Sequence, residues 1–344
     1  MMTTLFRFIR KSCSNAVFSR SAWLQLSAGI RVQHFARLLA VVAVVRCAVS
    51  GNFVHGDDLP DVQRTEDVIY GRKDGMALTM DVFRPAKSNG CGIIYLVNGG
   101  WLSSKATPRM QNVQPDFYKM FLERGYTVFA VVTSSQPRYT IPDLIGDAQR
   151  SVRFVRANAA QFGVRPDRLA VTGSSSGGHL TLSVATMGGP GQLDASDPVD
   201  RESSAVQAAA CFFPPTDFLN YGGTGISGVA EGPLKPLKAA FGPRSETEAG
   251  RQALGKEISP IYFVTGELPP TLIIHGDRDE VVPLQQSQIF VERARSVGIK
   301  EIELIVRTGK GHGWPEGSIV WKSEEDIHEF NRWFDTHLLK SRSI

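Results

Sequence analysis

The feature that most constrains the fold of this chain is a series of short, almost wholly apolar runs that alternate with helical patterns. Several of the runs lack the polar alternation of a strand with one solvated face, which is typical of a parallel sheet covered by helices on both sides. The alternation therefore predicts an α/β fold with a mostly parallel central sheet. The strand-like runs are Met76–Phe83, Ile93–Val97, Tyr126–Val132, Leu169–Thr172, Ala208–Phe213, Thr271–Ile274 and Ile302–Val306.

Apolar residues at helical spacing mark three of the connecting segments. The clearest runs from Thr140 to Phe162, with Thr140 in position to cap its first turn. A second spans about residues 284–297, and a third starts at Ser323 with Asp326 in the capping-box position. At the other end of the chain, Val68–Tyr70 is expected to pair with the first run as an antiparallel hairpin at the sheet edge.

Residues 57–344 are predicted to form one α/β domain. One segment within it lacks the alternation of strand-like runs and helical patterns. Residues 217–264 contain no clean strand pattern. An insertion of this size above the functional edge of a sheet usually serves as a cap or lid, although a surface excursion without function is the alternative.

The charge of the chain is unevenly distributed. Its net charge is +4, but no acidic residue precedes Asp57 while seven cations do. Without those seven, 31 cations face 34 acidic residues, a balance of −3. A slightly acidic domain argues against nucleic acid as its main partner. With hydrophobic residues at 42% and charged residues at 21%, the composition is that of an ordinary globular protein.

Residues 1–56 are interpreted as a basic N-terminal leader. Its apolar run Leu38–Val45 is too short to span a bilayer, which needs about 20 residues, so no stable membrane span is expected. The run fits the central region of a secretory signal, with small residues at Ala48 and Ser50 for cleavage near residue 50. Export to the periplasm or the medium is therefore the favoured reading. An Arg-rich transit-like segment, or a downstream start that would leave the protein cytoplasmic, is the alternative.

A serine between glycines lies where a strand-like run meets a helical pattern. Leu169–Thr172 is followed by Gly-Ser-Ser-Ser-Gly at residues 173–177, and a helix is expected from Gly177 onward. A G-x-S-x-G pattern in this setting is typical of a nucleophile elbow, a turn so sharp that its central residue adopts a strained backbone. Of the three serines, only Ser175 has glycine two residues away on both sides. Ser175 is therefore the predicted nucleophile.

A serine hydroxyl is a poor nucleophile near neutral pH and needs an adjacent base, usually histidine. His312 lies in a glycine-rich loop, Gly309–Trp314, after the last strand-like run. Such a loop at the carboxyl edge of the sheet can bring an imidazole to Ser175, so His312 is the predicted base. Among the others, His179 is expected to point away from the elbow tip. The histidines set aside are His34, His55, His179, His275, His328 and His337.

A carboxylate must hold the imidazole in its productive tautomer and stabilise its charged form. Three candidates follow the strand-like run at 271–274, namely Asp277, Asp279 and Glu280. Spacing alone does not choose among them. A metal site built from His275, Asp277 and Asp279 is a rival interpretation, but it lacks a further histidine or cysteine nearby.

An oxyanion hole is predicted in the loop after Ile93–Val97. This loop reads Asn98-Gly-Gly-Trp101, and glycines allow the backbone to approach a reacting group closely. Attack on an acyl carbon makes an oxyanion that needs fixed donors, and backbone amides serve this purpose. The expected donors are the amides of Gly100 and Trp101, with Gly99 in the same loop, and the amide of Ser176.

Taken together, these stretches resemble the α/β-hydrolase superfamily over about residues 65–340. Asn98–Trp101 resembles the His-Gly-Gly-Gly/Trp-type motif of the esterase and hormone-sensitive-lipase-like branch, with Asn98 replacing the usual histidine. Pro166–Leu180 is similar to the elbow of bacterial esterases of the feruloyl-esterase-like (BD-FAE) group. His275–Pro283 resembles the acid motif of that group, which places the carboxylate four residues after the histidine, at Asp279. The order Ser175, Asp279, His312 is that of α/β-hydrolases.

This resemblance implies a serine carboxylesterase that forms an acyl-enzyme on Ser175 and needs no metal or cofactor. The implied substrates are small-molecule esters with a short acyl group, or acylated carbohydrates. The alternatives are a peptidase or amidase of the prolyl-oligopeptidase or arylformamidase type. A binding protein on the same fold is disfavoured because Ser175, Asp279 and His312 are all present.

The residues that determine specificity are the least defined by the sequence. Trp101, Tyr139 and Trp314 are candidates for lining the substrate pocket, because they lie on or near loops at the carboxyl edge. Large aromatic residues are more often part of the core, which is the alternative for each of them. No feature of the sequence indicates the oligomeric state.

Overall fold

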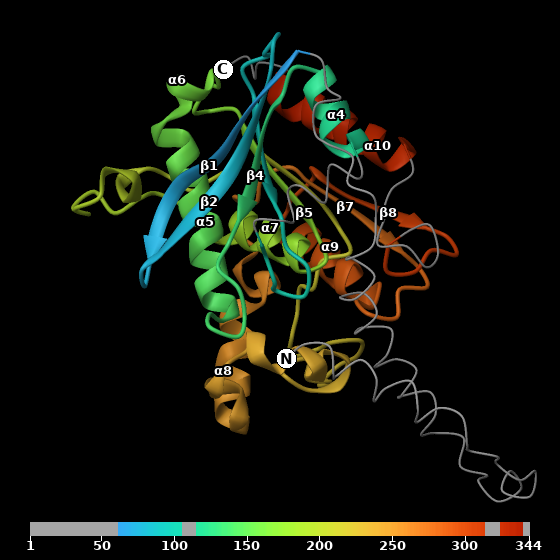
Figure 1. Ribbon diagram of the computed structural model, residues 1–344. Helices are drawn as coiled ribbons and strands as arrows, with labels where there is room; N and C mark the ends of the chain where they lie inside the picture. Colours follow the sequence, from blue (N-terminus) through green and yellow to red (C-terminus); the bar gives the residue numbers. More distant parts are fainter. Residues whose placement is uncertain (1–60, 105–114, 314–323, 340–344) are drawn as a thin grey trace, which may run out of the picture. The chain divides into compact units, whose positions relative to one another are not determined.

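A single eight-stranded sheet organises the computed structural model, which describes residues 61–104, 115–313 and 324–339 (Figure 1). The strand order is β1-β2-β4-β3-β5-β6-β7-β8, so that β5 lies near the centre between β3 and β6. The β1–β2 and β2–β4 pairs are antiparallel, and every other pair is parallel. The strands are β1 (Val62–Lys73), β2 (Met76–Pro85), β3 (Gly92–Leu96), β4 (Thr127–Val132), β5 (Leu169–Ser174), β6 (Ala208–Phe212), β7 (Thr271–Gly276) and β8 (Ile302–Arg307).

Helices connect these strands on both faces of the sheet. The α-helices are α4 (Pro115–Glu123), α5 (Ile141–Ala157), α6 (Ala159–Phe162), α7 (Ser176–Met187), α8 (Glu248–Ile258), α9 (Gln285–Ser296) and α10 (Glu324–Phe334). Short 3-10 segments are η3 (Pro198–Arg201), η4 (Gly232–Ala240), η5 (Pro243–Glu246) and η6 (Pro260–Phe263), and a π-helical turn, η7 (Asp335–Leu339), follows α10.

Side chains that alternate along each strand enter two separate hydrophobic cores. On one face, Ile94 and Val171 pack with residues of α5, α7 and α9. On the other face, Ile93 and Ala170 pack with residues of α4 and α10, two helices that contact each other (Figure 1). The strands are apolar on both faces because both faces are covered. The predicted α/β fold with a mostly parallel sheet is confirmed.

The seven strand-like runs of the sequence all form strands, and the hairpin at the sheet edge is present as β1 and β2. The predicted helix over 140–162 is interrupted, because α5 ends at Ala157 and the short α6 follows Asn158. The carboxylate of Asp143 accepts hydrogen bonds from the amide and hydroxyl of Thr140, which caps α5 as expected. Asp326 binds Arg307, with its Oδ1 2.6 Å from Nε, and its predicted capping box with Ser323 stays a prediction because Ser323 lies outside the described residues.

The segment 217–264 contains no strand and carries η4, η5, α8 and η6. It touches several loops at the carboxyl edge of the sheet. The Tyr221 hydroxyl donates to the carbonyl of Val281 at 3.0 Å. A β-carbon built on Gly100 would lie 3.3 Å from the Leu237 side chain. The segment therefore packs against loops of this edge, and its interpretation as a cap stays a prediction.

Two sequence-based predictions concern residues that the structure does not describe. The leader, and with it the predicted cleavage site and export, lies outside the described residues, as does Ser323. Within the part of the chain that the structure describes, no helix is both long enough and apolar enough to cross a membrane.

The packing of α10 gives a direct test of the second core. Phe330 is fully buried and stacks on Phe212 of β6, with ring centroids 4.5 Å apart. Phe330→Ala is expected to lower the free energy of unfolding by about 3–5 kcal/mol, because it removes buried area and leaves a cavity. Chemical denaturation measures this, with Leu193→Ala as control at an 86% exposed side chain. Equal stability of the two variants would contradict the assignment of α10 to the core.

Candidate functional site

Ser175 occupies a turn between β5 and α7 whose backbone is strained. Its φ is 56° and its ψ −120°, outside the regions that L-residues normally occupy. The turn is held from both sides, because the Ser175 amide donates to the Phe212 carbonyl at 3.0 Å and the His179 amide donates to the Ser175 carbonyl at 2.8 Å. Ser175 itself is only partly buried. The elbow expected from the sequence is present.

The glycines around Ser175 are required by close packing. A β-carbon at Gly173 would lie 2.5 Å from the Gly177 carbonyl oxygen, and one at Gly177 would lie 2.5 Å from the Leu96 carbonyl oxygen. Neither distance is compatible with a side chain. The strand, the turn and the helix can therefore approach closely enough to project the Ser175 hydroxyl from the edge of the sheet.

His312 lies beside Ser175 although 137 positions separate them in the sequence. Its Nε2 is 3.0 Å from the Ser175 Oγ and its Nδ1 is 2.7 Å from Asp279 Oδ2. The imidazole packs against the ring of Phe213, with centroids 4.5 Å apart. Its side chain is 20% exposed, so one edge remains accessible to a substrate. The three predicted residues thus form one continuous chain of hydrogen bonds.

Asp279 is the most strongly held member of this chain. Its Oδ1 accepts the amides of Val281 and Val282 at 2.9 and 2.8 Å, and its Oδ2 accepts His312 and lies 3.4 Å from Nε2 of His275. Burial raises the pKa of Asp279, but the hydrogen bonds and charges of the two histidines outweigh it and hold that pKa far below its ordinary value. The carboxylate stays ionised next to His312.

The other two acidic candidates do not reach His312. Asp277 is exposed and accepts the amide of Gly309 at 2.6 Å, which ties the acid loop to the loop that carries His312. Glu280 is also exposed. Among the residues that the structure describes, no group of three or more His, Cys, Asp or Glu side chains is arranged to hold a metal ion. The structure thus selects Asp279 and gives the rival metal site no support.

The amides of the loop after β3 have different roles. Gly99 donates to the Leu102 carbonyl at 3.0 Å, so its amide is already used and the prediction of Gly99 as a donor is wrong. Gly100 and Trp101 have φ of 59° and 58°, and in the described part of the chain their amides donate to no acceptor. The amide of Ser176, at the start of α7, belongs to the first turn, whose N–H groups have no partner within the helix.

Asn98 links this loop to the elbow. Its side-chain oxygen accepts the Ser176 hydroxyl at 2.7 Å, and its amide nitrogen donates to the Thr133 hydroxyl at 3.2 Å. Asn98 is 8% exposed. The asparagine that replaces the usual histidine of the motif therefore braces both this loop and the elbow.

The prediction of three aromatic substrate-pocket residues is wrong for the side chains of two of them and stays untested for the third. The Trp101 side chain is 2% exposed and packs against His179, Phe218 and Phe241, so it belongs to the core. Tyr139 is also buried, and its hydroxyl lies 3.5 Å from the carbonyl of Lys73 near the β1–β2 hairpin. Both aromatic rings are retained by apolar packing rather than presented at Ser175. Trp314 lies outside the described residues.

Two buried histidines near the site were set aside by the sequence analysis. His275 donates from Nε2 to the Val282 carbonyl at 2.9 Å, and its Nδ1 is 2.7 Å from the Ser287 hydroxyl. His179 contacts Trp101 and the carbonyl of Ile258. Each is fully buried. Their positions in the sequence could have indicated that they support the site, because His275 directly precedes the acid loop and His179 lies one helical turn after Ser175.

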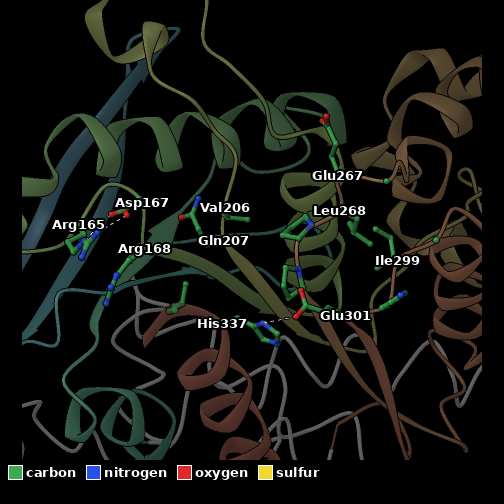
Figure 2. A pocket seen from close by; sticks show the side chains of 16 residues that line it. Arg165, Asp167, Arg168, Val206, Gln207, Glu267, Leu268, Ile299, Glu301 and His337 are labelled. Carbon is green, nitrogen blue, oxygen red and sulfur yellow. Dashed lines mark hydrogen bonds and ion pairs between the residues drawn. The ribbon is translucent and has the colours of Figure 1, made fainter. Parts of the chain in front are cut away.

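A large cavity lies away from the candidate site. A cavity of about 1110 Å³, whose lining side chains Figure 2 shows, lies at the amino ends of β5 to β8. Ser175 lies at the opposite edge of the sheet. Its lining includes Arg165, which is paired with Asp167, and His337, which lies 3.8 Å from Glu301. None of the predicted catalytic residues lines it. The candidate site is therefore defined by hydrogen-bond geometry.

The buried His179 makes stability depend on pH. Burial, only partly offset by the hydrogen bond to Ile258, lowers the pKa of His179 to about 4. An unfolded histidine has a pKa of about 6.5, so the unfolded chain binds a proton at this residue more readily than the folded protein does. The free energy of unfolding is therefore unaffected by this residue above pH 6.5 and falls by about 3 kcal/mol in all as the pH drops toward 4. Denaturation at pH 7 and pH 4 should show a loss larger by about this amount in the wild type than in His179→Gln. An equal loss in both proteins would contradict the assignment.

Comparison with known proteins gives matches over most of the described chain. A family model described as BD-FAE matches residues 80–294. Esterase LipQ of Mycobacterium tuberculosis is 31% identical over 244 residues, which are 68% of this chain and 53% of LipQ. The probable carboxylic ester hydrolase LipM of the same organism is 28% identical over 250 residues, 69% of this chain and 53% of LipM. The chain thus spans about half the length of these curated relatives.

Solved structures share the fold. A truncated carbohydrate esterase from gut microbiota superposes with a TM-score of 0.66 at 24% identity, covering 81% of this chain and 97% of that one. A thermophilic esterase, Est2 of Thermogutta terrifontis, gives a TM-score of 0.61 at 23% identity, covering 83% and 96%. At these identities the likeness shows the α/β-hydrolase fold alone. Because the family model matches well over half of the 344 residues, from within β2 to within α9, the chain belongs to the BD-FAE family.

Proposed function

We propose that this protein is a serine carboxylesterase that hydrolyses short-chain or carbohydrate-linked carboxylic esters through an acyl-enzyme on Ser175. The observation that carries the proposal is the hydrogen-bond chain from Asp279 through His312 to Ser175, with distances of 2.7 and 3.0 Å. This chain of hydrogen bonds ends at the hydroxyl of Ser175, which lies in a turn with a strained backbone. This order of serine, histidine and carboxylate supports the proposal, because acyl transfer uses a nucleophile, a base and an orienting carboxylate linked in the same way.

In the first half of the reaction, His312 Nε2 takes the proton of the Ser175 hydroxyl as the oxygen attacks the ester carbon. The resulting imidazolium is stabilised by the ionised Asp279, which also fixes the tautomer by accepting from Nδ1. His312 then gives the proton to the leaving alcohol. The acyl group remains on Ser175.

The negative charge that develops on the carbonyl oxygen needs donors that are fixed before the reaction begins. In the described part of the chain, the amides of Gly100 and Trp101 make no hydrogen bond, and the amide of Ser176 lies at the N-terminus of α7. A helix N-terminus also favours negative charge. We assign these three amides as the oxyanion donors.

In the second half, a water molecule takes the place of the alcohol. His312 removes a proton from it, the water oxygen attacks the acyl carbon, and collapse of the tetrahedral intermediate returns the proton to Ser175. The acid product leaves and the enzyme is regenerated. The chain's own side chains and amides carry out each of these steps.

The relatives support ester over amide substrates. LipQ is named an esterase and LipM a probable carboxylic ester hydrolase, and a structural neighbour is a carbohydrate esterase. Carbohydrate-linked esters are therefore included in the proposed substrate class. The peptidase or amidase alternative has no comparable support.

Export remains part of this proposal because the leader fits a secretory signal, with small residues at Ala48 and Ser50. Expression of the full-length chain in a bacterial host, followed by N-terminal sequencing of the mature protein, tests it. A new N-terminus near residue 51 in the periplasm or medium is expected. Retention of the intact leader in the cytoplasm would contradict export.

The three consecutive serines supply a matched test of the nucleophile. Ser175→Ala is expected to abolish hydrolysis of p-nitrophenyl acetate and butyrate, because no other hydroxyl contacts His312 Nε2 among the described residues. Ser174→Ala is the control, and it should hydrolyse both esters as the wild type does. Hydrolysis retained by Ser175→Ala would overturn the esterase proposal. Faster cleavage of the anilide analogue than of the ester would favour the amidase alternative.

A second test separates the acidic candidates. Asp279→Asn is expected to lower kcat on p-nitrophenyl butyrate by about a thousandfold or more, since the amide no longer stabilises the imidazolium and permits the wrong tautomer. Glu280→Gln, one position along the same loop and exposed, is expected to keep the wild-type kcat. Similar kcat values for the two variants would exclude Asp279 as the orienting carboxylate.

A further inference from the structure

The side chain of Trp101, one of the predicted oxyanion donors, is fixed by a polar contact in the core. Its indole Nε1 donates to Nδ1 of His179 at 3.3 Å. His179 Nε2 lies 2.7 Å from the carbonyl oxygen of Ile258, at the end of α8. One fully buried imidazole therefore connects the loop after β3, the helix that follows Ser175 and the cap segment.

The chemistry of the two neighbours fixes the tautomer of His179. An indole N–H can only donate and a carbonyl oxygen can only accept, so Nδ1 must carry the lone pair and Nε2 the proton. Burial keeps the ring neutral, since it lowers the pKa of His179 to about 4. Both ring nitrogens are thus used, and the imidazole has a single orientation that satisfies them.

The backbone of Trp101 is held separately, by Gln136. The side-chain amide of Gln136 donates to the carbonyl of Gly100 at 2.6 Å, and the backbone N–H of Gln136 donates to the carbonyl of Trp101 at 3.2 Å. In a planar trans peptide the C=O and the N–H point in opposite directions. The bond to the Gly100 carbonyl therefore turns the amide of Trp101 away from Gln136, and leaves it without an internal acceptor.

Trp101 needs such support because its φ of 58° is unfavourable for a residue with a side chain. Without restraint, the peptide between Gly100 and Trp101 can relax to a more favourable orientation and remove the donor. We infer that His179 and Gln136 are positioning residues that hold Trp101, the one by its indole and the other by its peptide, so that its amide serves as an oxyanion donor. This inference rests on the esterase function proposed above.

Substitutions at His179 separate its two hydrogen bonds. Asparagine places an oxygen close to the position of Nδ1 and can still accept from the indole of Trp101. Glutamine places a nitrogen close to the position of Nε2 and keeps the bond to Ile258, but loses the acceptor for Trp101. Thermal unfolding of both variants measures how much stability each substitution costs. Activity is then measured at a temperature well below the lower of the two unfolding midpoints.

The expected result is a division between kcat and KM. Loss of an entire oxyanion donor costs about a hundredfold to a thousandfold in kcat. His179→Gln should lower kcat on p-nitrophenyl butyrate by about tenfold to a hundredfold with KM little changed, and His179→Asn should restore most of it. Affinity for an alkyl trifluoromethyl ketone, whose adduct with Ser175 carries the oxyanion, should fall in parallel with kcat.

Gln136→Ala provides a second variant at a partly buried position, in case His179→Gln does not fold. It should show the same loss of kcat and of ketone affinity. Thr186→Ala is the control on the same helix, because its hydroxyl donates only to the Leu182 carbonyl at 2.8 Å. It should keep the wild-type values of both.

The outcomes distinguish the two proposals. If Ser175→Ala still hydrolyses the ester, the esterase function itself is wrong. If Ser175→Ala is inactive while folded His179→Gln and Gln136→Ala keep the wild-type kcat and ketone affinity, the function stands and the positioning role is overturned. Equal losses in His179→Asn and His179→Gln would also overturn it, since the acceptor for Trp101 would then not matter.

Discussion

The whole site depends on the contact between β5 and α7 at the elbow. The φ of 56° at Ser175 is unfavourable, and it persists because the surrounding backbone leaves no alternative. Gly173 and Gly177 allow β5, β3 and α7 to approach to distances that would exclude a side chain. Ser175 is thereby fixed at the carboxyl edge of the sheet, and the other functional groups are positioned relative to it.

Parallel strand order explains how groups far apart in sequence meet at this edge. The acid loop follows β7, the loop with His312 follows β8, and both therefore leave the sheet on the same side as the elbow. The two loops are also packed together, since a β-carbon on Gly276 would lie 2.2 Å from the Lys310 carbonyl oxygen. Asp277 adds a hydrogen bond between them. The distance between Asp279 and His312 is thus determined by backbone packing as well as by their own hydrogen bond.

The sequence predicted the sheet, the elbow at Ser175 and the loop of His312 well, because apolar runs and glycine-flanked turns are local signals with direct structural causes. Spacing left three acidic candidates, and only the resemblance to a family motif pointed to Asp279. The sequence was less informative for the oxyanion loop. The amide of Gly99 is used in a tight turn with the nearby Leu102, which the glycine pattern of the loop did not reveal. The burial of the Trp101 ring and its bond to His179 arise from packing between segments 78 positions apart. Tertiary contacts of this kind are visible only once the fold is known.

The proposed function requires Ser175 to be the nucleophile of a serine hydrolase. The most direct measurement is mass spectrometry of the folded protein after treatment with a fluorophosphonate, followed by mapping of the adduct within the tryptic peptide Leu169–Arg201. We expect one phosphonyl group per chain, on Ser175, and a labelling rate that falls sharply in His312→Ala. An unmodified protein, or an adduct on Ser174, Ser176 or elsewhere that forms as fast without His312, would contradict this role of Ser175.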